Sequence, residues 1–177
     1  MARVFEYDGI TAINFVDLQE GEVFKILEFR NHPQISKWMY KSSVISLQAH
    51  LDFIENLKTT PSSAFWLFKQ GETMLGVGSL TRISITHQNA CVGMYKNPSL
   101  SKVGDKIMQA LQKIAFEAFW LRTLMLEVIA TNRYAINCYE RNGFEYTGRL
   151  KDFVCMNKVF QDVLIYQKIN PRIRARL

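Results

Sequence analysis

The sequence predicts a mixed α/β (α+β) domain in which an antiparallel meander of strands precedes a βαβ-like unit. Three consecutive strand patterns between residues 64 and 96, separated by turn residues, indicate the meander. Helical and strand patterns then alternate through residues 103–168, which indicates the second unit. A length of 177 residues fits one domain. We therefore expect a single domain at residues 1–170, followed by a basic tail at 171–177.

The N-terminal part is expected to form one strand and two helices. The strand lies at residues 11–16, and a helix follows over about residues 21–30. Pro33 fits a chain that is no longer helical, because proline has no N–H to donate. Ser46 can cap a second helix. One apolar stripe of that helix consists of Leu47, Leu51, Ile54 and Leu57.

The later elements follow from turn residues and from the period of the apolar residues. Gln70-Gly71-Glu72 predicts a hairpin turn between the first two meander strands, and Asn97-Pro98 ends the third. Gly143 can end the last helix in a left-handed conformation. The expected strands are 64–69, 74–83, 89–96, 123–129, 144–150 and 159–168, and the expected helices are 103–120 and 133–142.

The composition limits the partners and the compartment. The net charge of +6 suggests an anionic partner, for which nucleic acid, a membrane surface and phosphorylated small molecules all qualify. Part of this charge belongs to the tail at 171–177, which is typical of a solvated chain end. We read no transmembrane helix and no signal peptide, since no long apolar run occurs. We expect a cytoplasmic protein without a metal, because its three cysteines lack CxxC spacing and its three histidines are scattered.

The strongest motif is the segment 132–144, NRYAINCYERNGF. Ala135, Ile136 and Tyr139 fall on one face of a helix, and the small Ala135 permits close packing. An ordinary amphipathic helix with a core tyrosine would show the same periodicity. The segment matches every fixed position of the pattern N-x-x-A-I-x-x-Y-E-x-x-G-F, and in this it is similar to the GCN5-related N-acetyltransferases.

That resemblance implies a fold, a cofactor and two residue roles. The fold is a mixed central sheet of about seven strands with about four helices, in which the fourth and fifth strands splay apart. The cofactor is acetyl-coenzyme A, as acetyl donor. The tyrosine at the position of Tyr139 serves as general acid for the leaving thiolate, which is costly to release in an apolar groove. The asparagine at Asn132 contacts the pantetheine arm or positions the splayed strand.

The pyrophosphate loop of the family aligns with residues 99–104, followed by a helix start. Gly104 matches the last glycine of the loop pattern, but Ser99 and Lys102 replace two of its fixed residues. Backbone N–H groups and the helix dipole can still form an anion site there. The resemblance implies that the cofactor contacts are Tyr95, Lys96, Lys102, Val103, Gly104, Asp105, Lys106, Asn132, Ala135 and Tyr139.

Glu127 lies at the spacing from Asn132 that is seen in bacterial ribosomal-protein acetyltransferases, where the equivalent glutamate can act as base. Glu127 and Tyr139 would then form the acid–base pair, although a glutamate on an exposed strand face explains the residue equally well. Cys138 and Cys91 raise the alternative of an acyl-enzyme, but neither has a histidine adjacent in sequence. We expect direct attack of the amine on acetyl-coenzyme A.

The N-terminal half narrows the resemblance to one group. Arg30-Asn31-His32-Pro33 followed by Trp38-Met39-Tyr40 resembles the pseudaminic-acid pathway acetyltransferases, which acetylate the 4-amine of a UDP-linked 4-amino-4,6-dideoxy sugar. The likeness continues through most of the chain, in LxxHLxFIE (47–55), LGVGS (75–79), GxYKNP (93–98), AFE (115–117), LEV (126–128) and GRLK (148–151).

Carried over by position, this resemblance implies a nucleotide-sugar pocket. Its residues would be Arg30, Met39, Tyr40, His50, Phe53, Thr81, Arg82 and Tyr95. Aromatic and thioether faces suit a uracil, and cationic donors suit a diphosphate. Arg82 stands where the group has a lysine, which keeps the charge and changes the geometry. Hydrophobic core is the competing explanation for each aromatic residue.

Two other functions remain open from the sequence. The first is an N-terminal acetyltransferase of ribosomal proteins or peptides, which needs an open groove. The second is a non-catalytic module that binds acetyl-coenzyme A or nucleic acid; the basic tail favours it and the intact Tyr139 counts against it. We expect no nucleic-acid or membrane partner, and a monomer or a homodimer.

Overall fold

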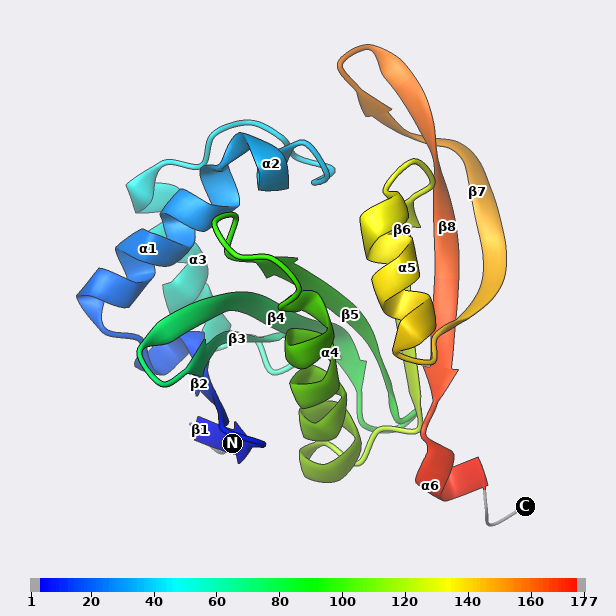
Figure 1. The fold of residues 1–177 in the computed structure, drawn as a ribbon, viewed down its shortest axis with the longest axis horizontal. Coiled ribbons are helices and arrows are strands. Elements are labelled where there is room, and N and C mark those ends of the chain that lie inside the picture. Colours follow the sequence, from blue (N-terminus) through cyan, green and yellow to red (C-terminus); the bar gives the residue numbers. More distant parts are fainter. Residues whose placement is uncertain (1–3, 175–177) are drawn as a thin grey trace.

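The computed structural model describes residues 4–174, with side chains to residue 172, and arranges them around one eight-stranded sheet (Figure 1). The strand order is β1-β2-β3-β4-β5-β6-β8-β7. The strands are β1 (Val4–Tyr7), β2 (Ile10–Asn14), β3 (Ala64–Gln70), β4 (Thr73–Ser84), β5 (Asn89–Lys96), β6 (Thr123–Ile129), β7 (Glu145–Met156) and β8 (Val159–Ile169).

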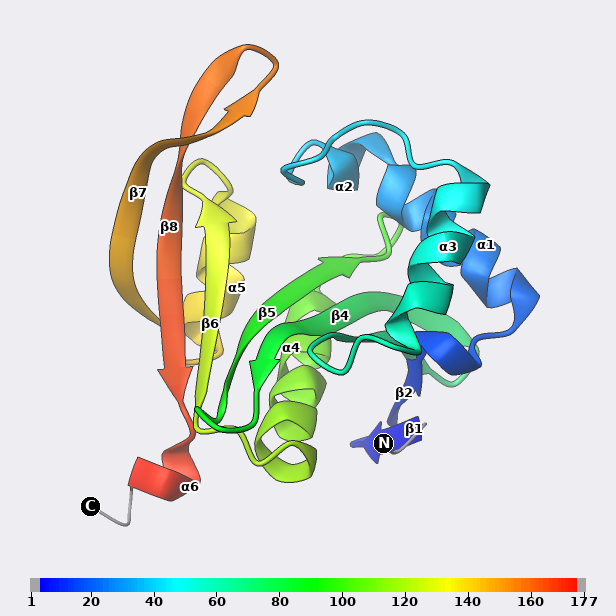
Figure 2. The ribbon, with the colours of Figure 1, turned by 180° about the vertical axis from the view of Figure 1, so that it is seen from behind.

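Helices cover both faces of this sheet. The helices are α1 (Glu20–Asn31), α2 (Pro33–Ser36), α3 (Leu47–Leu57), α4 (Gly104–Lys113), α5 (Arg133–Arg141) and α6 (Pro171–Arg174). A 3-10 turn, η1, spans Phe15–Asp17, and a π turn, η2, spans Ile114–Ala118. Figures 1 and 2 show α4 and α5 on one face and α1 and α3 on the other. No helix within residues 4–174 has the length and apolarity to cross a membrane.

The central prediction of a fork between two neighbouring strands is confirmed. The expected fourth and fifth strands, β5 and β6, pair in parallel over Asn89–Thr123, Ala90–Leu124 and Cys91–Met125 only. Beyond Cys91, β5 pairs with β4 alone, and beyond Met125, β6 pairs with β8 alone. Past these pairs, the edge of β5 that faces β6 and the edge of β6 that faces β5 keep backbone N–H and C=O groups that do not pair with each other.

The structure corrects several element boundaries. The sheet has eight strands where about seven were expected, because residues 4–7 form an additional edge strand. The first expected strand ends at Asn14, whose side chain accepts from the Val16 N–H and starts the η1 turn. Pro33 begins α2 at a position where its missing N–H costs nothing. The expected helix 103–120 becomes α4 and then η2, and the expected strand 144–150 extends to Met156 as β7.

The core lies mainly between the sheet and α4. Leu111 on α4 is fully buried among Trp66, Phe68 and Leu124 of the same cluster. Burying one such side chain contributes about 1.5–3 kcal/mol. A smaller cluster on the opposite side contains Phe15, Ile26, Leu67 and Val77. The two clusters fix α4 and α1 to opposite faces of the strands that lead to the fork.

The start of α4 is attached to α5 by a network around Asp105. The Asp105 carboxylate accepts hydrogen bonds from Asn142 Nδ2 (2.7 Å), Arg141 Nη2 (3.0 Å) and Cys138 Sγ (3.5 Å). A Cβ at Gly104 would lie 3.3 Å from Cys138 Sγ, so the absence of a side chain there permits the close approach of the two helices. The network therefore determines how the first turn of α4 faces α5.

This network predicts an acid-sensitive contribution to stability. Burial alone would raise the pKa of Asp105, but the hydrogen bonds from Arg141, Asn142 and Cys138 outweigh it and hold the pKa below its ordinary value of 3.8. The carboxylate thus stabilises the fold above that value, and the contribution is lost as the pH falls through the lower folded pKa. Asp105→Ala should reduce the free energy of unfolding by about 1–2 kcal/mol at pH 7, measured by urea titration.

The difference between wild type and Asp105→Ala should shrink below about pH 4, as the pH falls toward the lowered pKa of Asp105 and this carboxylate becomes protonated in the wild type. Asp52→Ala on the exposed face of α3 is the matched control, since Asp52 only accepts from Gln48. An effect of Asp52→Ala as large as that of Asp105→Ala would contradict the role of the network.

Candidate active site

Helix α5 carries the sequence motif and begins and ends as the motif predicts. The Asn132 side chain caps the helix by accepting from the Ala135 N–H at 3.3 Å. Gly143 follows the helix with a φ of +76°, a conformation that L side chains rarely adopt. The Asn132 side chain therefore has a structural role as a helix cap, and its proposed contact with a pantetheine arm stays a prediction.

Tyr139 lies on the buried face of α5, with 8% of its surface exposed. Its ring packs edge-on against Phe144, with centroids 6.2 Å apart. Burial raises the pKa of Tyr139 above its ordinary value of 10.0, and the neighbouring Cys138 adds to this effect. No described residue forms a hydrogen bond with its hydroxyl. The phenol is therefore protonated at neutral pH and is held in an apolar environment, as a general acid requires.

The first turn of α4 presents a site suited to an anion. The N–H groups of Gly104, Asp105 and Lys106 have no hydrogen-bond partner among the described residues. Lys102 precedes the helix with a φ of +57°, and its side chain is exposed. Lys106 donates to Gln70 Oε1 at 2.9 Å. Val103, the residue before the helix, is buried and gives no side-chain cap.

Lys96, one of the expected cofactor contacts, forms its hydrogen bonds within its own loop. Its Nζ donates to the carbonyls of Leu100 (2.5 Å), Asn97 (3.2 Å) and Pro98 (3.3 Å). Burial lowers the pKa of its amine. Lys96 therefore organises the loop that leads to α4, and its contact with the cofactor is not tested by these bonds.

Glu127 is held at the fork by two donors from distant parts of the chain. Its Oε2 accepts from the Tyr40 hydroxyl at 2.8 Å, and its Oε1 accepts from Arg82 Nη2 at 2.8 Å. Glu127 lies two residues beyond Met125, the last β6 residue paired with β5. Tyr40 and Arg82 belong to the part of the chain before the fork, so the three side chains connect both arms of the fork.

Two β-bulges direct side chains into this cluster. The pairing of β4 with β5 shifts between Thr81 and Ser84, and Arg82 within the shift has a φ of +51°. The pairing of β7 with β8 shifts between Leu150 and Val154, and Phe153 lies in that segment. The Phe153 ring meets the Tyr40 ring edge-on, with centroids 6.5 Å apart.

Arg30 reaches the same segment from α1. Its Nη2 donates to the Lys41 carbonyl at 2.8 Å, while its buried Nη1 has no partner among the described residues. Burial lowers the pKa of Arg30, and the nearby Tyr95 opposes this. Burial also raises the pKa of Tyr95. A buried guanidinium nitrogen without a partner is costly, so Arg30 offers a donor to an anionic ligand.

His50 and Phe53 lie in a separate group. His50 is buried and packs edge-on against Phe15 at 6.5 Å, and burial lowers its pKa. Phe53 packs edge-on against Phe65 at 5.0 Å. No described contact joins these two residues to Glu127. Met39 and Thr81 are neighbours in sequence of Tyr40 and Arg82, and all these substrate assignments stay predictions.

The cysteines and the histidines form no other reactive centre in the part of the chain that the structure describes. Cys91 and Cys138 are buried, and Cys155 is exposed. Burial raises the pKa of Cys91, and it raises that of Cys138 to about 12 with a further contribution from Asp105. No group of three His, Cys, Asp or Glu residues among residues 4–172 is placed to hold a metal ion.

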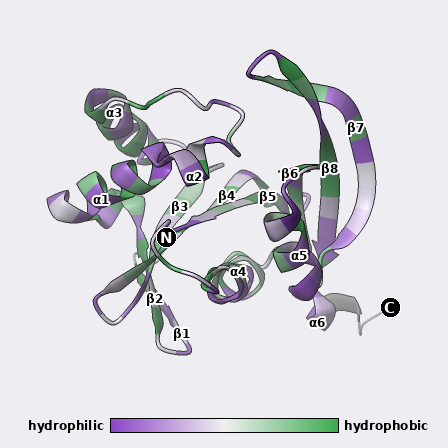
Figure 3. Cartoon of the chain, turned by 45° about the horizontal axis from the view of Figure 1, so that its top comes forward, coloured by the Kyte–Doolittle hydropathy of each residue, from purple (hydrophilic) through white to green (hydrophobic). Residues whose placement is uncertain are grey.

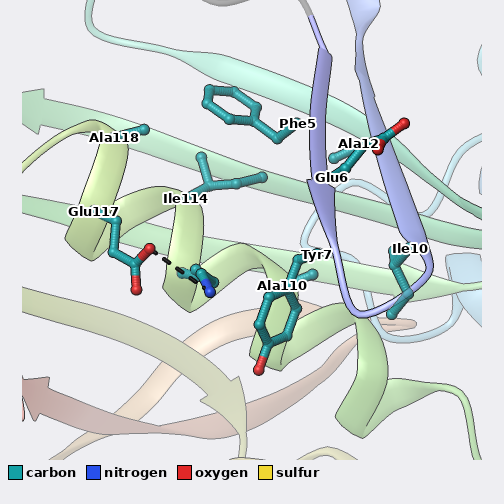
Figure 4. A pocket seen from close by; sticks show the side chains of 10 residues that line it. Phe5, Glu6, Tyr7, Ile10, Ala12, Ala110, Ile114, Glu117 and Ala118 are labelled. Atoms are coloured by element: carbon teal, nitrogen blue, oxygen red, sulfur yellow. Dashed lines mark ion pairs between the residues drawn. The ribbon is translucent and has the colours of Figure 1, made fainter.

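Two hollows lie apart from the predicted site residues. One, of about 290 Å³, lies between Trp38, Ile129 and the tip of the β7–β8 hairpin. The other, of about 100 Å³, lies between the β1–β2 hairpin and α4 (Figure 4), where Ala110 and Ile114 face Phe5 and Tyr7. None of the residues predicted for the site lines either hollow.

Sequence reasoning missed three residues that shape the site. Arg141 and Asn142 hold Asp105, and they occupy the variable positions of the motif, next to its glycine. Phe153 supports Tyr40 from a strand that was expected to end at residue 150. Residues 153–156 form an apolar run, FVCM, and this run was the signal that could have extended the strand to include Phe153.

The fork, the buried tyrosine and the anion site at a helix start define an acetyltransferase of the GNAT class. The chain matches the acetyltransferase (GNAT) domain family over residues 10–165, and it therefore belongs to the GNAT family of N-acetyltransferases. The predicted fold class and enzyme class are confirmed.

Within this family the chain is similar to acetyltransferase PseH. PseH of Campylobacter jejuni subsp. jejuni serotype O:2 is 35% identical over 147 residues, which cover 82% of this chain and 92% of that protein. The crystal structure of C. jejuni N-acetyltransferase PseH in complex with acetyl coenzyme A superposes with a TM-score of 0.71 at 25% identity, over 91% of this chain and 99% of that one. Spermidine N-acetyltransferase from Vibrio cholerae, with CoA and spermine, has a TM-score of 0.83 at 17% identity, over 92% of this chain and 96% of that one. This last likeness concerns the fold alone.

The cluster at the fork yields a prediction for Glu127. On the expectation that Glu127 is the general base, Glu127→Gln should lower kcat/KM for acetyl transfer by about 10²–10⁴-fold, because the amide cannot take up a proton but can still accept a hydrogen bond from Arg82. The measurement is release of coenzyme A thiol. Glu55→Gln on the exposed surface of α3 is the control. If Glu127→Gln kept wild-type kcat/KM, Glu127 would be a brace between the two arms and not the base.

Proposed function

We propose that this enzyme transfers the acetyl group of acetyl-coenzyme A to the 4-amino group of a UDP-4-amino-4,6-dideoxy sugar, UDP-4-amino-4,6-dideoxy-β-L-AltNAc. The reaction would serve pseudaminic acid biosynthesis for flagellin glycosylation. The observation that carries the proposal is the likeness to acetyltransferase PseH, which extends over 82% of this chain. The combination of the segments around Arg30 and Tyr40 with the further matches along the chain supports it.

The fork and α4 supply the proposed cofactor site. An extended pantetheine arm can lie between β5 and β6 and bond to the backbone groups that the strands leave unused beyond Cys91 and Met125. The first turn of α4 offers N–H groups and a positive dipole end to a pyrophosphate. Lys102 and Lys106 add positive charge to this end. These features support acetyl-coenzyme A as the donor, as in the PseH complex.

In the proposed reaction, the amine nitrogen attacks the thioester carbon and forms a tetrahedral intermediate. The C–S bond then breaks, and the Tyr139 hydroxyl gives its proton to the departing thiolate. The proton of the ammonium passes to Glu127, directly or through water, because each oxygen of the carboxylate keeps a lone pair beyond the one that accepts from Tyr40 or Arg82. Glu127 then releases its proton to solvent, and solvent restores the proton of Tyr139.

The proposed acceptor suits the charges at the site. Arg30 and Arg82 are cationic donors for a diphosphate, and Arg30 Nη1 is a buried donor without a partner among the described residues. The pKa of a sugar amine lies nearer to that of an α-amine, about 8, than to that of lysine, about 10.4. A weak base is therefore sufficient to deprotonate it.

Direct transfer is favoured over an acyl-enzyme. The Cys138 thiol, with a pKa of about 12, is protonated at neutral pH and donates to Asp105. Cys91 is buried, and burial raises its pKa as well. Neither thiol is activated as a nucleophile, so the proposed transfer runs from the thioester directly to the amine, with Tyr139 and Glu127 as the proposed acid and base.

The alternative function is an N-terminal acetyltransferase of ribosomal proteins or peptides. The cation Arg30 beside a half-buried Tyr95 favours a compact anionic acceptor over a peptide. Thiol release should be measured across a panel of UDP-amino sugars and peptides. Turnover of the UDP-4-amino sugar supports the proposal, and turnover of peptides alone would overturn it.

Tyr139→Phe should lower kcat by about 10²–10⁴-fold, because the leaving thiolate loses its proton donor. The circular dichroism spectrum should remain that of the wild type, since the ring contact with Phe144 is kept. Because burial raises the pKa of Tyr139, the wild-type rate should not decline through loss of this proton below about pH 10. Tyr134→Phe is the control on the same helix, at a ring that is 91% exposed.

Arg30→Ala should raise KM for the sugar nucleotide at least tenfold and leave KM for acetyl-coenzyme A within about twofold, because the lost charge pairs with a phosphate. Steady-state kinetics with each substrate varied in turn provide the measurement. Lys25→Ala, at an exposed position of α1, is the matched control. A raised KM for acetyl-coenzyme A with an unchanged KM for the sugar nucleotide would show that Arg30 does not bind the sugar nucleotide.

A further inference from the structure

The C-terminal end of α5 lies at the base of the fork and contacts both of its arms, the first formed by β1 to β5 and the second by β6 to β8. Lys168 of β8 lies opposite Leu124 of β6, which is one of the three β6 residues that pair with β5. The Lys168 amine donates to the Asn142 carbonyl at 2.6 Å. On its other side, Asn142 bonds to α4, which packs against β4 and β5. Asn142 therefore connects the second arm with the helix that covers the first.

Asn142 is buried, and its amide and its carbonyl each make two hydrogen bonds to other groups. The side-chain Nδ2 donates to Asp105 Oδ1 on α4 at 2.7 Å and to the Cys138 carbonyl at 2.8 Å. The Asn142 carbonyl accepts from Gln112 Nε2 on α4 at 3.1 Å as well as from Lys168. Figure 3 shows α4 and α5 side by side. An amide suits this position, because a carboxylate and a carbonyl both need a donor.

The end of α5 that Asn142 anchors is also the end that carries Tyr139. The N–H groups of Asn142 and Phe144 both donate to the Tyr139 carbonyl, at 3.1 and 3.0 Å. The Phe144 ring packs against the Tyr139 ring. Asp105, which Asn142 holds on the other side, belongs to the first turn of α4, where the proposed pyrophosphate site lies. A shift of Asn142 would thus move the proposed proton donor and the proposed pyrophosphate site relative to one another.

We propose that Asn142 is a positioning residue for acetyl transfer. It holds Tyr139 and the first turn of α4 at a fixed separation, so that a cofactor bound at the helix start has its thioester sulfur beside the phenol. The inference rests on the proposed function, which makes Tyr139 the acid and α4 the pyrophosphate site. Catalysis depends steeply on such placement, since a displacement of about 1 Å can lower a rate about 10²-fold.

The first test is steady-state kinetics of full-length Asn142→Leu, at a temperature at which circular dichroism shows it to be folded. Leucine has the same branched shape as asparagine but removes both donors. Its kcat should fall about 10- to 100-fold. Its KM for acetyl-coenzyme A should rise about two- to fivefold, the range of one anion interaction at a helix start. Its KM for the acceptor should stay at the wild-type value, because Arg30 and Glu127 form their described hydrogen bonds with other residues.

Two further variants make the test specific. Asn137→Leu is the matched control, since Asn137 is exposed on the same helix, and its kcat and both KM values should equal those of the wild type. Lys168→Met removes the bond from β8 to the Asn142 carbonyl and leaves the bond to Asp105 in place. Its kcat should fall several-fold, whereas its Kd for coenzyme A, measured by calorimetry, should stay at the wild-type value.

A merely structural role of Asn142 would give a different result. Asn142→Leu and Lys168→Met would then unfold at lower temperature, and the folded enzymes would keep the wild-type kcat, which would overturn the inference. If Asn142→Leu does not fold, Lys168→Met decides alone, and a wild-type kcat in that variant overturns the inference.

Failure of this inference can be told apart from failure of the proposed function. If the wild type acetylates the UDP-4-amino sugar and Tyr139→Phe lowers kcat, the function holds, and an unchanged kcat in Asn142→Leu and Lys168→Met overturns the inference alone. If the wild type acetylates no UDP-amino sugar, the proposed function fails. Asn142→Leu should even then raise the Kd for coenzyme A about two- to fivefold, and an unchanged Kd would overturn the inference as well.

Discussion

The separation of β5 from β6 after three residue pairs is the constraint on which the rest of this structure depends. A parallel pair that continued to Lys96 would consume the backbone groups on both inner edges. Because the pair stops at Cys91 and Met125, the sheet divides into two arms, and each arm keeps an unsatisfied edge. An extended ligand can satisfy those edges, and Tyr139 and the start of α4 are positioned on the covered face beside them.

On the face of the sheet away from α4 and α5, the two arms of the fork are connected by side chains. Tyr40 and Arg82, from the first arm, both donate to Glu127 on the second. These contacts connect the arms through side chains, which can exchange partners, and the strands themselves stay apart. Phe153 supports the connection from β7. The fork is therefore bounded by packed helices on the α4–α5 side and by polar side-chain contacts around Glu127 on the other side.

The sequence predicted what is local and missed what is assembled from distant segments. Helix α5 was predicted with its end at Gly143, because the motif and the stop are contained in one short stretch. The cap by the Asn132 side chain was not predicted, because the resemblance drew attention to a cofactor contact at that residue. Strand β1 was missed because its four residues give too short a pattern. The hydrogen bond between Tyr40 and Glu127 spans 87 residues, and a separation of that size leaves no trace in periodicity. Lys96 shows a similar limit: the resemblance implied a cofactor contact, which stays a prediction, but it gave no sign that Lys96 Nζ donates hydrogen bonds to the carbonyls of its own loop.

The three cysteines differ in exposure, so one of them can be labelled selectively. Cys91 and Cys138 are enclosed, whereas Cys155 is open to solvent on β7, next to Met156 in the β7–β8 hairpin. A thiol-directed fluorophore will therefore attach selectively near the hairpin tip without any engineering of the chain. Emission from such a label follows the movement of that strand in real time, during the turnover of an otherwise unaltered enzyme.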